Sequence, residues 1–152
     1  MTIKNILLIA ITLSNLMLSP SVYAQSSSSG GAEKAAIEDN KATWSASHVD
    51  AQGAYELLIS NPQTIVLDIR TSKEISNGYI EGAKFVDFYD DDFAQHLSKL
   101  DREAHYIVHC AIGGRSSDAL TIFKKLGFTN ITHMDGGIRS WKRKKLPLIQ
   151  KN

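Results

Sequence analysis

The sequence predicts an α/β fold with a parallel central β-sheet flanked by helices on both faces. Between residues 50 and 141, short apolar runs alternate with stretches whose apolar residues have helical spacing. The apolar runs are nearly continuous, as in strands buried on both sides. Such alternation is typical of strand–helix–strand units, which build a parallel sheet and cover both of its faces.

The first predicted elements are a helix and a buried strand. Asp50 can cap a helix whose apolar residues recur at three- and four-residue spacing as far as Leu58. Asn61-Pro62 then ends that helix. Residues 65–69 form a short, nearly continuous apolar run, which indicates a buried parallel strand.

Two short helices and a second strand are expected next. Thr71 and Glu74 form a capping-box pattern for a short helix that ends at Asn77-Gly78. Residues 85–88 are a candidate strand. The three aspartates at 90–92 suit the N-terminus of an amphipathic helix that follows them.

The second half of the domain repeats the alternation and contains its clearest helix. We expect a strand at 106–109, a helix at 116–126 closed by Gly127, a strand at 130–134, and a short helix through Trp141 after Gly136-Gly137.

One cysteine stands where such a sheet binds its ligands. Cys110 directly follows the strand expected at 106–109 and precedes the helix expected at 116–126. Ligands of open parallel sheets lie beyond the carboxyl ends of the strands. A lone cysteine is in general a small buried hydrophobic residue, but this position indicates a functional thiol.

The residues that follow this cysteine form a candidate anion-binding loop, namely Ala111, Ile112, Gly113, Gly114, Arg115 and Ser116. The two glycines let the backbone curl so that successive N–H groups face inward at a helix N-terminus. That field favours the thiolate form of Cys110. Arg115 adds a permanent charge with a forked set of donors for an oxyanion. We therefore predict a nucleophilic cysteine in an amide-lined loop.

Residues 110–116 resemble the active-site loop of the rhodanese (thiosulfate sulfurtransferase) superfamily, C-x-x-G-x-R-S. Three further segments agree with the family in order and spacing. Residues 68–70 resemble its D-x-R, residues 74–83 its E…G-H-I-P-G-A, and residues 136–141 its closing G-G…W. The resemblance implies the rhodanese-like version of the α/β fold.

Outside the loop, the sequence departs from the family pattern at two positions. Tyr79 replaces the usual histidine and Glu81 the usual proline, and neither lies in the reactive loop. The resemblance also implies supporting roles for two residues of the D-x-R segment. Asp68 is expected to brace the loop, and Arg70 to pair near Glu74.

The resemblance implies a ping-pong sulfur transfer. In that scheme the Cys110 thiolate attacks the outer sulfur of thiosulfate or a similar anionic donor, and the sulfur stays on the cysteine as a persulfide. Amides of residues 111–116 stabilise its charge, and cyanide or a thiol then removes the sulfur. We expect no metal and no organic cofactor, and a protein sulfur acceptor is left open as a partner.

A cysteine-dependent phosphatase or arsenate reductase is the first alternative. His109, Cys110 and Arg115 superficially match the phosphatase signature H-C-x5-R. Here four residues separate the cysteine from the arginine, whereas the signature has five. A loop that is one residue shorter suits a single sulfur atom better than a tetrahedral phosphate.

The second alternative is a non-catalytic persulfide carrier or binding module, in which Cys110 hands sulfur to a protein partner. The sequence does not separate sulfur carriage from turnover, and it leaves the physiological donor and the oligomeric state open.

Composition excludes several other classes of protein. The chain has 17 Lys+Arg against 16 Asp+Glu, which gives no electrostatic support for binding nucleic acid or an anionic membrane. A single cysteine excludes an intramolecular disulfide, a multi-cysteine zinc site and a dithiol oxidoreductase. The five histidines show no metal-ligand spacing along the sequence.

The N-terminal segment has the pattern of a cleaved signal peptide over residues 1–24. Lys4 precedes an apolar stretch that is too short to span a bilayer, and Val22-Tyr23-Ala24 suits a signal peptidase. Residues 25–43 read as a flexible Ser/Gly-containing linker, and residues 44–148 as a single domain. We therefore expect an exported, periplasmic protein whose mature chain has no membrane span.

Overall fold

The structure, a computed structural model, describes residues 44–150. The predicted signal peptide and linker lie outside the described residues. Among the residues described, no helix combines the length and the apolar character that crossing a bilayer requires.

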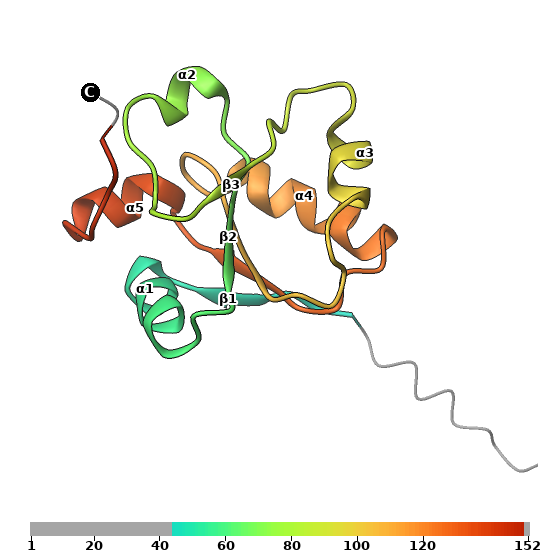
Figure 1. Cartoon of the computed structure of the whole chain (residues 1–152), viewed down its shortest axis with the longest axis horizontal. Coiled ribbons are helices and arrows are strands. Elements are labelled where there is room, and N and C mark those ends of the chain that lie inside the picture. Colours follow the sequence, from blue (N-terminus) through green and yellow to red (C-terminus); the bar gives the residue numbers. More distant parts are fainter. Residues whose placement is uncertain (1–43, 151–152) are drawn as a thin grey trace, which may run out of the picture. The chain divides into compact units, whose positions relative to one another are not determined.

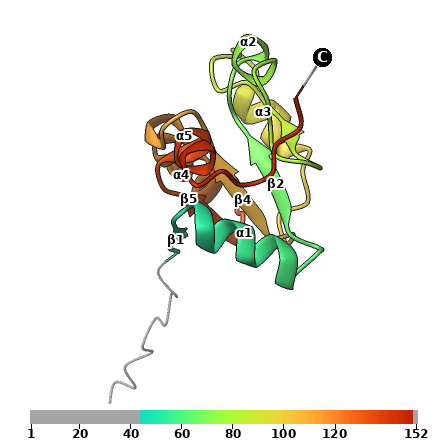
Figure 2. The ribbon, with the colours of Figure 1, turned by 90° about the vertical axis from the view of Figure 1, so that its left-hand side faces the viewer.

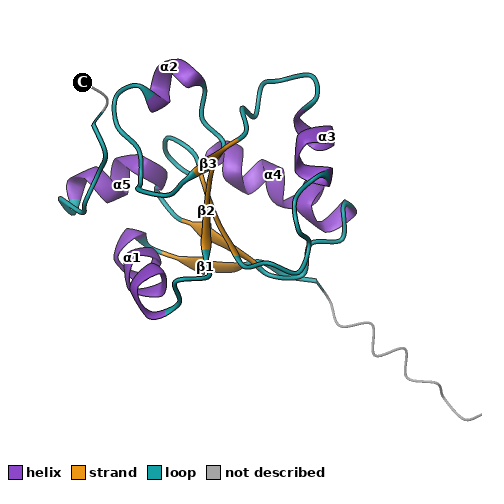
Figure 3. Ribbon diagram, in the orientation of Figure 1, coloured by secondary structure: helices purple, strands orange, loops and turns teal. Residues whose placement is uncertain are grey.

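Five strands form one sheet in which every pairing is parallel. The order across the sheet is β1-β5-β4-β2-β3, so the two neighbours of β4, β5 and β2, come from distant parts of the sequence. Figure 3 draws the strands in orange and the helices in purple. The strands are β1 Ser47–Val49, β2 Ile65–Asp68, β3 Lys84–Phe85, β4 Tyr106–His109 and β5 Ile131–Met134.

Helices cover both faces of the sheet, as predicted. Figure 1 shows α1 and α5 on one side of the strands and α3 and α4 on the other, and Figure 2 shows the same layers turned by 90°. The side chains of β4 alternate between two cores. Tyr106 and Val108 join the core under α3 and α4, whereas Ile107 joins the core under α1 and α5. The helices are α1 Ala51–Ser60, α2 Ser72–Ile75, α3 Phe93–Ser98, α4 Gly114–Lys125 and α5 Gly137–Arg143.

Two of the predicted helix starts depend on the side chains that the sequence indicated. Asp50 caps α1 by accepting a hydrogen bond of 2.8 Å from the amide of Gly53. Thr71 and Glu74 form a complete capping box at α2, in which each side chain accepts from the backbone N–H of the other residue.

Two strands differ from the prediction. The strand expected at 85–88 is limited to β3, although the N–H groups of residues 86 and 88 still donate to carbonyls of residues 68 and 69. The short edge strand β1 was not predicted. Its residues are exposed or half-buried, so it has no continuous apolar run to reveal it.

The helix after the cysteine starts two residues earlier than expected. Gly113 has a φ of 107°, a left-handed conformation that glycine adopts without strain, and α4 begins directly after it at Gly114. The last two residues of the predicted loop, Arg115 and Ser116, therefore lie in the first turn of α4.

Candidate active site

The parallel register brings three strand ends together around Cys110. Asp68, at the end of β2, is paired with His109, at the end of β4, and β5 places His133 beside Val108. Cys110 directly follows β4, which lies between β5 and β2 in the sheet. The cysteine is therefore at the carboxyl edge of the sheet. Ligands bind at this edge in open parallel sheets.

The sulfur of Cys110 accepts hydrogen bonds from inside the loop. The amide of Gly113 lies 3.2 Å from Sγ, and the hydroxyl of Ser116 lies 3.6 Å from it. Burial raises the pKa of the Cys110 thiol, but donors from the backbone and hydroxyl of Ser116 and from the amides of Ile112 and Gly113 outweigh burial and lower it. The buried thiol is thus held in surroundings that favour the thiolate.

The loop directs its amides inward because donors outside the loop bind its carbonyls. The carbonyl of Cys110 accepts from the amide of Ile138 at 2.9 Å, and that of Ala111 accepts from the amide of Arg139 at 3.0 Å. Both amides belong to the N-terminal turn of α5, where N–H groups have no partner within the helix. The close contact between the start of α5 and the loop requires a glycine at position 137, because a Cβ there would lie 2.4 Å from the Cys110 carbonyl oxygen.

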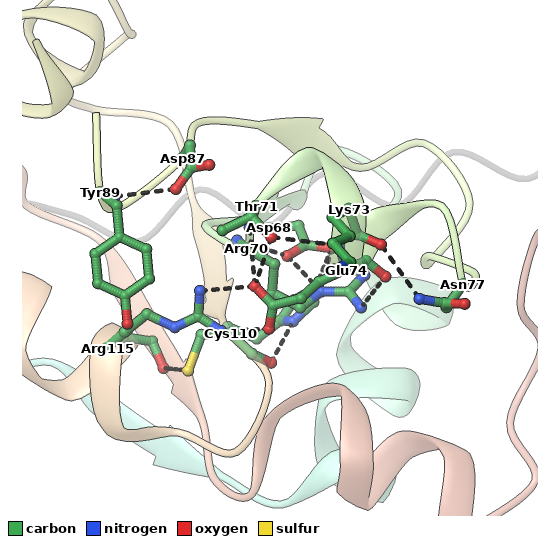
Figure 4. A network of polar contacts seen from close by, with 12 residues as sticks. Asp68, Arg70, Thr71, Lys73, Glu74, Asn77, Asp87, Tyr89, Cys110 and Arg115 are labelled. Atoms are coloured by element: carbon green, nitrogen blue, oxygen red, sulfur yellow. Dashed lines mark hydrogen bonds and ion pairs between the residues drawn. The ribbon is translucent and has the colours of Figure 1, made fainter.

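The charge of Arg115 is already paired with a carboxylate. Its two terminal nitrogens lie 2.9 Å and 2.6 Å from the two carboxylate oxygens of Glu74 (Figure 4). The centroid of the Tyr89 ring lies 5.3 Å from the guanidinium carbon of Arg115. We expected this fork to be available to an oxyanion. The structure instead places it in a bidentate ion pair that ties α2 to the first turn of α4.

Of the two supporting residues, Arg70 lies near Glu74, as the resemblance implied, whereas Asp68 does not hydrogen-bond the loop directly. Arg70 donates three hydrogen bonds of 2.6–3.0 Å to the buried carboxylate of Asp68 (Figure 4). Arg70 also reaches the carbonyls of Glu74, at 3.3 Å, and Gly78, at 3.0 Å. Within residues 44–150, Asp68 has no hydrogen bond to residues 110–116. Asp68 supports the loop through Arg70, which fixes the segment that carries Glu74. The Asp68 carboxylate also lies 3.7 Å from Nε2 of His109, whose Nδ1 lies 3.2 Å from the Cys110 carbonyl oxygen.

A cavity of about 510 Å³ adjoins the loop, and Ala111 and Ile112 form part of its wall. Cys110 is not in that wall. Ile112 projects from the loop and is 54% exposed. Three cations of α5 also line this cavity, namely Arg139, Lys142 and Arg143. Lys142 and Arg143, at the C-terminal end of α5, therefore share this cavity with the loop.

Under the loop lies a histidine that the sequence gave no reason to select. His133 is 4% exposed, and its Nε2 lies 2.9 Å from the Ser116 hydroxyl and 3.1 Å from the Gly113 carbonyl oxygen. Its Nδ1 lies 2.9 Å from Oδ1 of Asp135. The pairing of β1 with β5 sets His48 opposite His133, and Nδ1 of His48 lies 3.2 Å from the same Asp135 oxygen.

The spacing of three side chains in the described part of the chain is compatible with a metal ion. One potential ligand atom from each of His48, His133 and Asp135 lies within 4.8 Å of the others. Both imidazole Nδ1 atoms face a single carboxylate oxygen at hydrogen-bond distance. We therefore interpret the group as a hydrogen-bonded cluster. Only the folded sheet brings these residues together, which is why spacing along the sequence did not reveal them.

A family model of the rhodanese-like domain matches residues 50–144, which include every strand end and loop of this site. The chain belongs to the rhodanese-like domain family. A sulfurtransferase of Allochromatium vinosum is 25% identical to this rhodanese-like domain over 101 residues, which are 66% of this chain and 92% of that protein. The thiosulfate sulfurtransferase GlpE of Pseudomonas aeruginosa is 30% identical over 77 residues, or 51% and 68% of the two chains.

The rhodanese-like domain also resembles part of a larger protein. The Mycobacterium tuberculosis protein named "Probable adenylyltransferase/sulfurtransferase MoeZ" is 30% identical over 90 residues, which are 59% of this chain but only 23% of that relative. Among solved structures, a rhodanese-related protein of Thermoplasma volcanium has a TM-score of 0.62 and 28% identity, covering 69% of this chain and 99% of its own. The polysulfide-sulfur transferase homodimer of Wolinella succinogenes has a TM-score of 0.59 and 25% identity, covering 70% and 80%.

Replacing Glu74 with glutamine is expected to reduce stability in a pH-dependent way. The hydrogen bonds from Arg115, followed by those from Thr71, lower the Glu74 pKa from 4.5 to about 2. A carboxyl group with a depressed pKa in the folded state stabilises the fold above the pKa of the unfolded chain. That contribution is lost as the pH falls from 4.5 toward about 2. Because Glu74 is 33% exposed, we expect about 1 kcal/mol at neutral pH.

Urea unfolding of parent and Glu74→Gln protein between pH 7 and pH 2.5 measures this difference. The difference should shrink as the solution is acidified. The matched control is Glu81→Gln, because Glu81 is exposed and makes no ion pair within residues 44–150. A difference between parent and Glu74→Gln that stays constant down to the lowest pH would show that the Arg115 ion pair is not its source.

Proposed function

We propose that this protein is a sulfurtransferase that moves a sulfane sulfur from thiosulfate or a similar donor to cyanide or a thiol through a persulfide on Cys110. The observation that carries the proposal is the sulfur of Cys110, which accepts from the loop amides and the Ser116 hydroxyl and has a lowered pKa. The relatives named as sulfurtransferases support the same assignment.

The proposed chemistry needs one nucleophilic sulfur and one anion-stabilising loop. The Cys110 thiolate attacks the outer sulfur of thiosulfate, the sulfur–sulfur bond of the donor breaks, and sulfite leaves with the electron pair. The terminal sulfur of the persulfide carries negative charge, which loop amides at the N-terminus of α4 stabilise. Cyanide then attacks that terminal sulfur, leaves as thiocyanate, and returns the Cys110 thiolate.

The pairing of Arg115 argues against phosphatase chemistry. Arginine frequently binds a phosphate group through two parallel N–H donors. In this protein both terminal nitrogens of Arg115 are bonded to Glu74. A phosphate bound through those two nitrogens would have to break a bidentate ion pair, whereas transfer of a single sulfur atom leaves the pair intact.

Three assays distinguish the proposed function from its alternatives. Steady-state transfer from thiosulfate to cyanide supports the sulfurtransferase, and hydrolysis of p-nitrophenyl phosphate in its place supports the phosphatase. A carrier would accept one sulfur per chain and then pass it on only to a protein acceptor, without small-molecule turnover. The absence of sulfur transfer from thiosulfate to both cyanide and a small thiol would refute the sulfurtransferase assignment.

We also propose that the protein acts outside the cytoplasm, in the periplasm. The support for this location is the signal-peptide pattern of residues 1–24. Fractionation of cells that produce the full chain tests the location, and N-terminal sequencing of the mature protein should show cleavage after Ala24. An intact N-terminus in the cytoplasmic fraction would contradict export.

Inserting one glycine between Gly113 and Gly114 is expected to reduce sulfur transfer at least about tenfold, which corresponds to about 1.4 kcal/mol of transition-state stabilisation. The insertion gives the loop the cysteine-to-arginine spacing of the phosphatase signature and moves the amides away from a single sulfur atom. Glycine tolerates the dihedrals of such a turn. Steady-state thiosulfate-to-cyanide transfer measures the effect, and circular dichroism confirms that the variant is folded. Unchanged transfer in a folded variant would show that loop length does not select for sulfur.

A further inference from the structure

The hydroxyl of Ser116 has one proton and three acceptors within reach. Its Oγ lies 2.9 Å from Nε2 of His133, 3.0 Å from the carbonyl oxygen of Gly113 and 3.6 Å from the sulfur of Cys110. Sulfur is the most distant and, when neutral, the weakest of the three acceptors. The serine therefore donates to the cysteine only if the other two acceptors are already satisfied.

The protonation of the His133 imidazole determines whether the Gly113 carbonyl and Nε2 still need the serine proton. The Gly113 carbonyl already accepts from the Ser117 amide at 2.9 Å, so one further donor completes it. If Nε2 carries a proton, it supplies that donor from 3.1 Å and leaves the Ser116 hydroxyl to the sulfur. If Nε2 carries none, it accepts the serine proton itself, and the sulfur loses a donor.

Asp135 fixes the orientation of the His133 ring. Nδ1 faces Oδ1 of Asp135 at 2.9 Å and must carry a proton to bond to it. Nε2 is thereby turned toward the Ser116 hydroxyl and the Gly113 carbonyl. His48 also faces this carboxylate, and its ring centroid lies 4.9 Å from that of His133.

We propose that His133, held by Asp135, is a positioning residue that directs the Ser116 hydroxyl onto the sulfur of Cys110. The proposal builds on the sulfurtransferase function by naming what prepares its nucleophile. When the thiol ionises, its proton passes to Ser116 Oγ, and the former serine proton passes to Nε2 of His133. The products are a thiolate, a serine hydroxyl that points at it, and an imidazolium paired with Asp135.

The ionisation of Cys110 gives a direct readout, because the chain has no other cysteine. The rate of alkylation by iodoacetamide between pH 5 and pH 10 gives the Cys110 pKa, with a chelator present to exclude divalent ions. The assay requires neither sulfur donor nor acceptor. It can therefore succeed or fail independently of the proposed function.

Asp135→Asn is the main variant, because the Asp135 side chain is 55% exposed and its replacement should not disturb folding. We expect it to raise the Cys110 pKa by about one unit, a tenfold loss of thiolate below that pKa. Simple removal of a neighbouring negative charge would instead lower the thiol pKa, so the sign of the shift separates the two explanations. His48→Gln is the matched control, since His48 shares the carboxylate but has no contact with Ser116 in the described part of the chain.

Two further comparisons test whether the effect passes through the serine. Ser116→Ala should raise the Cys110 pKa by a similar amount, and adding Asp135→Asn to it should change nothing more. His133→Gln retains an N–H donor for Gly113 but cannot accept the serine proton, so it should raise the Cys110 pKa by less than His133→Leu, which loses both. A lowered or unchanged pKa in Asp135→Asn, or an equal shift with and without the Ser116 hydroxyl, would overturn the proposal.

Discussion

Replacing Cys110 with serine is expected to lower thiosulfate-to-cyanide sulfur transfer at least about a thousandfold, because the variant has no sulfur that can carry a persulfide. A serine hydroxyl at this position would still accept from the amide of Gly113, which lies 3.2 Å from the cysteine sulfur. The substitution is nearly isosteric, so we expect the free energy of unfolding to change by no more than about 1 kcal/mol.

The control for this substitution is Ser117→Ala, a change of an exposed side chain in the first turn of α4, directly after the loop. Transfer by Ser117→Ala should match that of the parent, and circular dichroism should show that both variants are folded. Substantial transfer by Cys110→Ser would mean that the sulfur does not pass through a persulfide on this residue.

Replacing Gly137 with alanine is expected to destabilise the domain by about 3 kcal/mol or more. Gly137 has a φ of +54°, and a Cβ there would lie 2.4 Å from the Cys110 carbonyl oxygen and 2.8 Å from the Ala111 carbonyl carbon. The left-handed conformation costs a non-glycine residue about 1 kcal/mol or more. The overlap adds to this cost, because both contacts are with backbone and cannot be relieved by a side-chain rotation.

Substitutions at two other glycines separate the cost of the left-handed conformation from the cost of the steric overlap. Gly82 has a φ of +72° but open space around its Cα, so Gly82→Ala should cost only about 1 kcal/mol. Gly114 has neither a positive φ nor a close neighbour, so Gly114→Ala should stay within about 0.5 kcal/mol of the parent. Urea unfolding ranks the three variants. A Gly137→Ala protein as stable as Gly82→Ala would show that α5 does not dock tightly on the loop.

The main elements of the fold could be predicted because each has a local signal. The buried strand β4 lies at the predicted residues 106–109, and the capping residues of α1 and α2 act as expected. The edge strand β1 has no such signal, because its exposed residues gain their partners only when β5 is already in place.

The candidate site shows the same division between local and long-range information. The position of Cys110 at a strand end and the turn at Gly113 are properties of one contiguous segment, which sequence reasoning can use. The pairing of Arg115 with Glu74 spans 41 residues, and the contact of His133 with Ser116 spans 17. These contacts depend on the strand order of the sheet. The sequence therefore indicated a loop with a free positive charge. In the folded protein the charge of Arg115 is paired with Glu74, and His133 contacts the Ser116 hydroxyl.

The most direct test of this account is the intact mass of the protein after incubation with thiosulfate and removal of the excess donor. We predict an increase equal to one sulfur atom, located on Cys110 by peptide mapping and reversed by cyanide with release of thiocyanate. The Cys110→Ser protein should show no increase. An unchanged mass in the parent protein, or a sulfur adduct that cyanide does not remove, would contradict persulfide-based sulfur transfer.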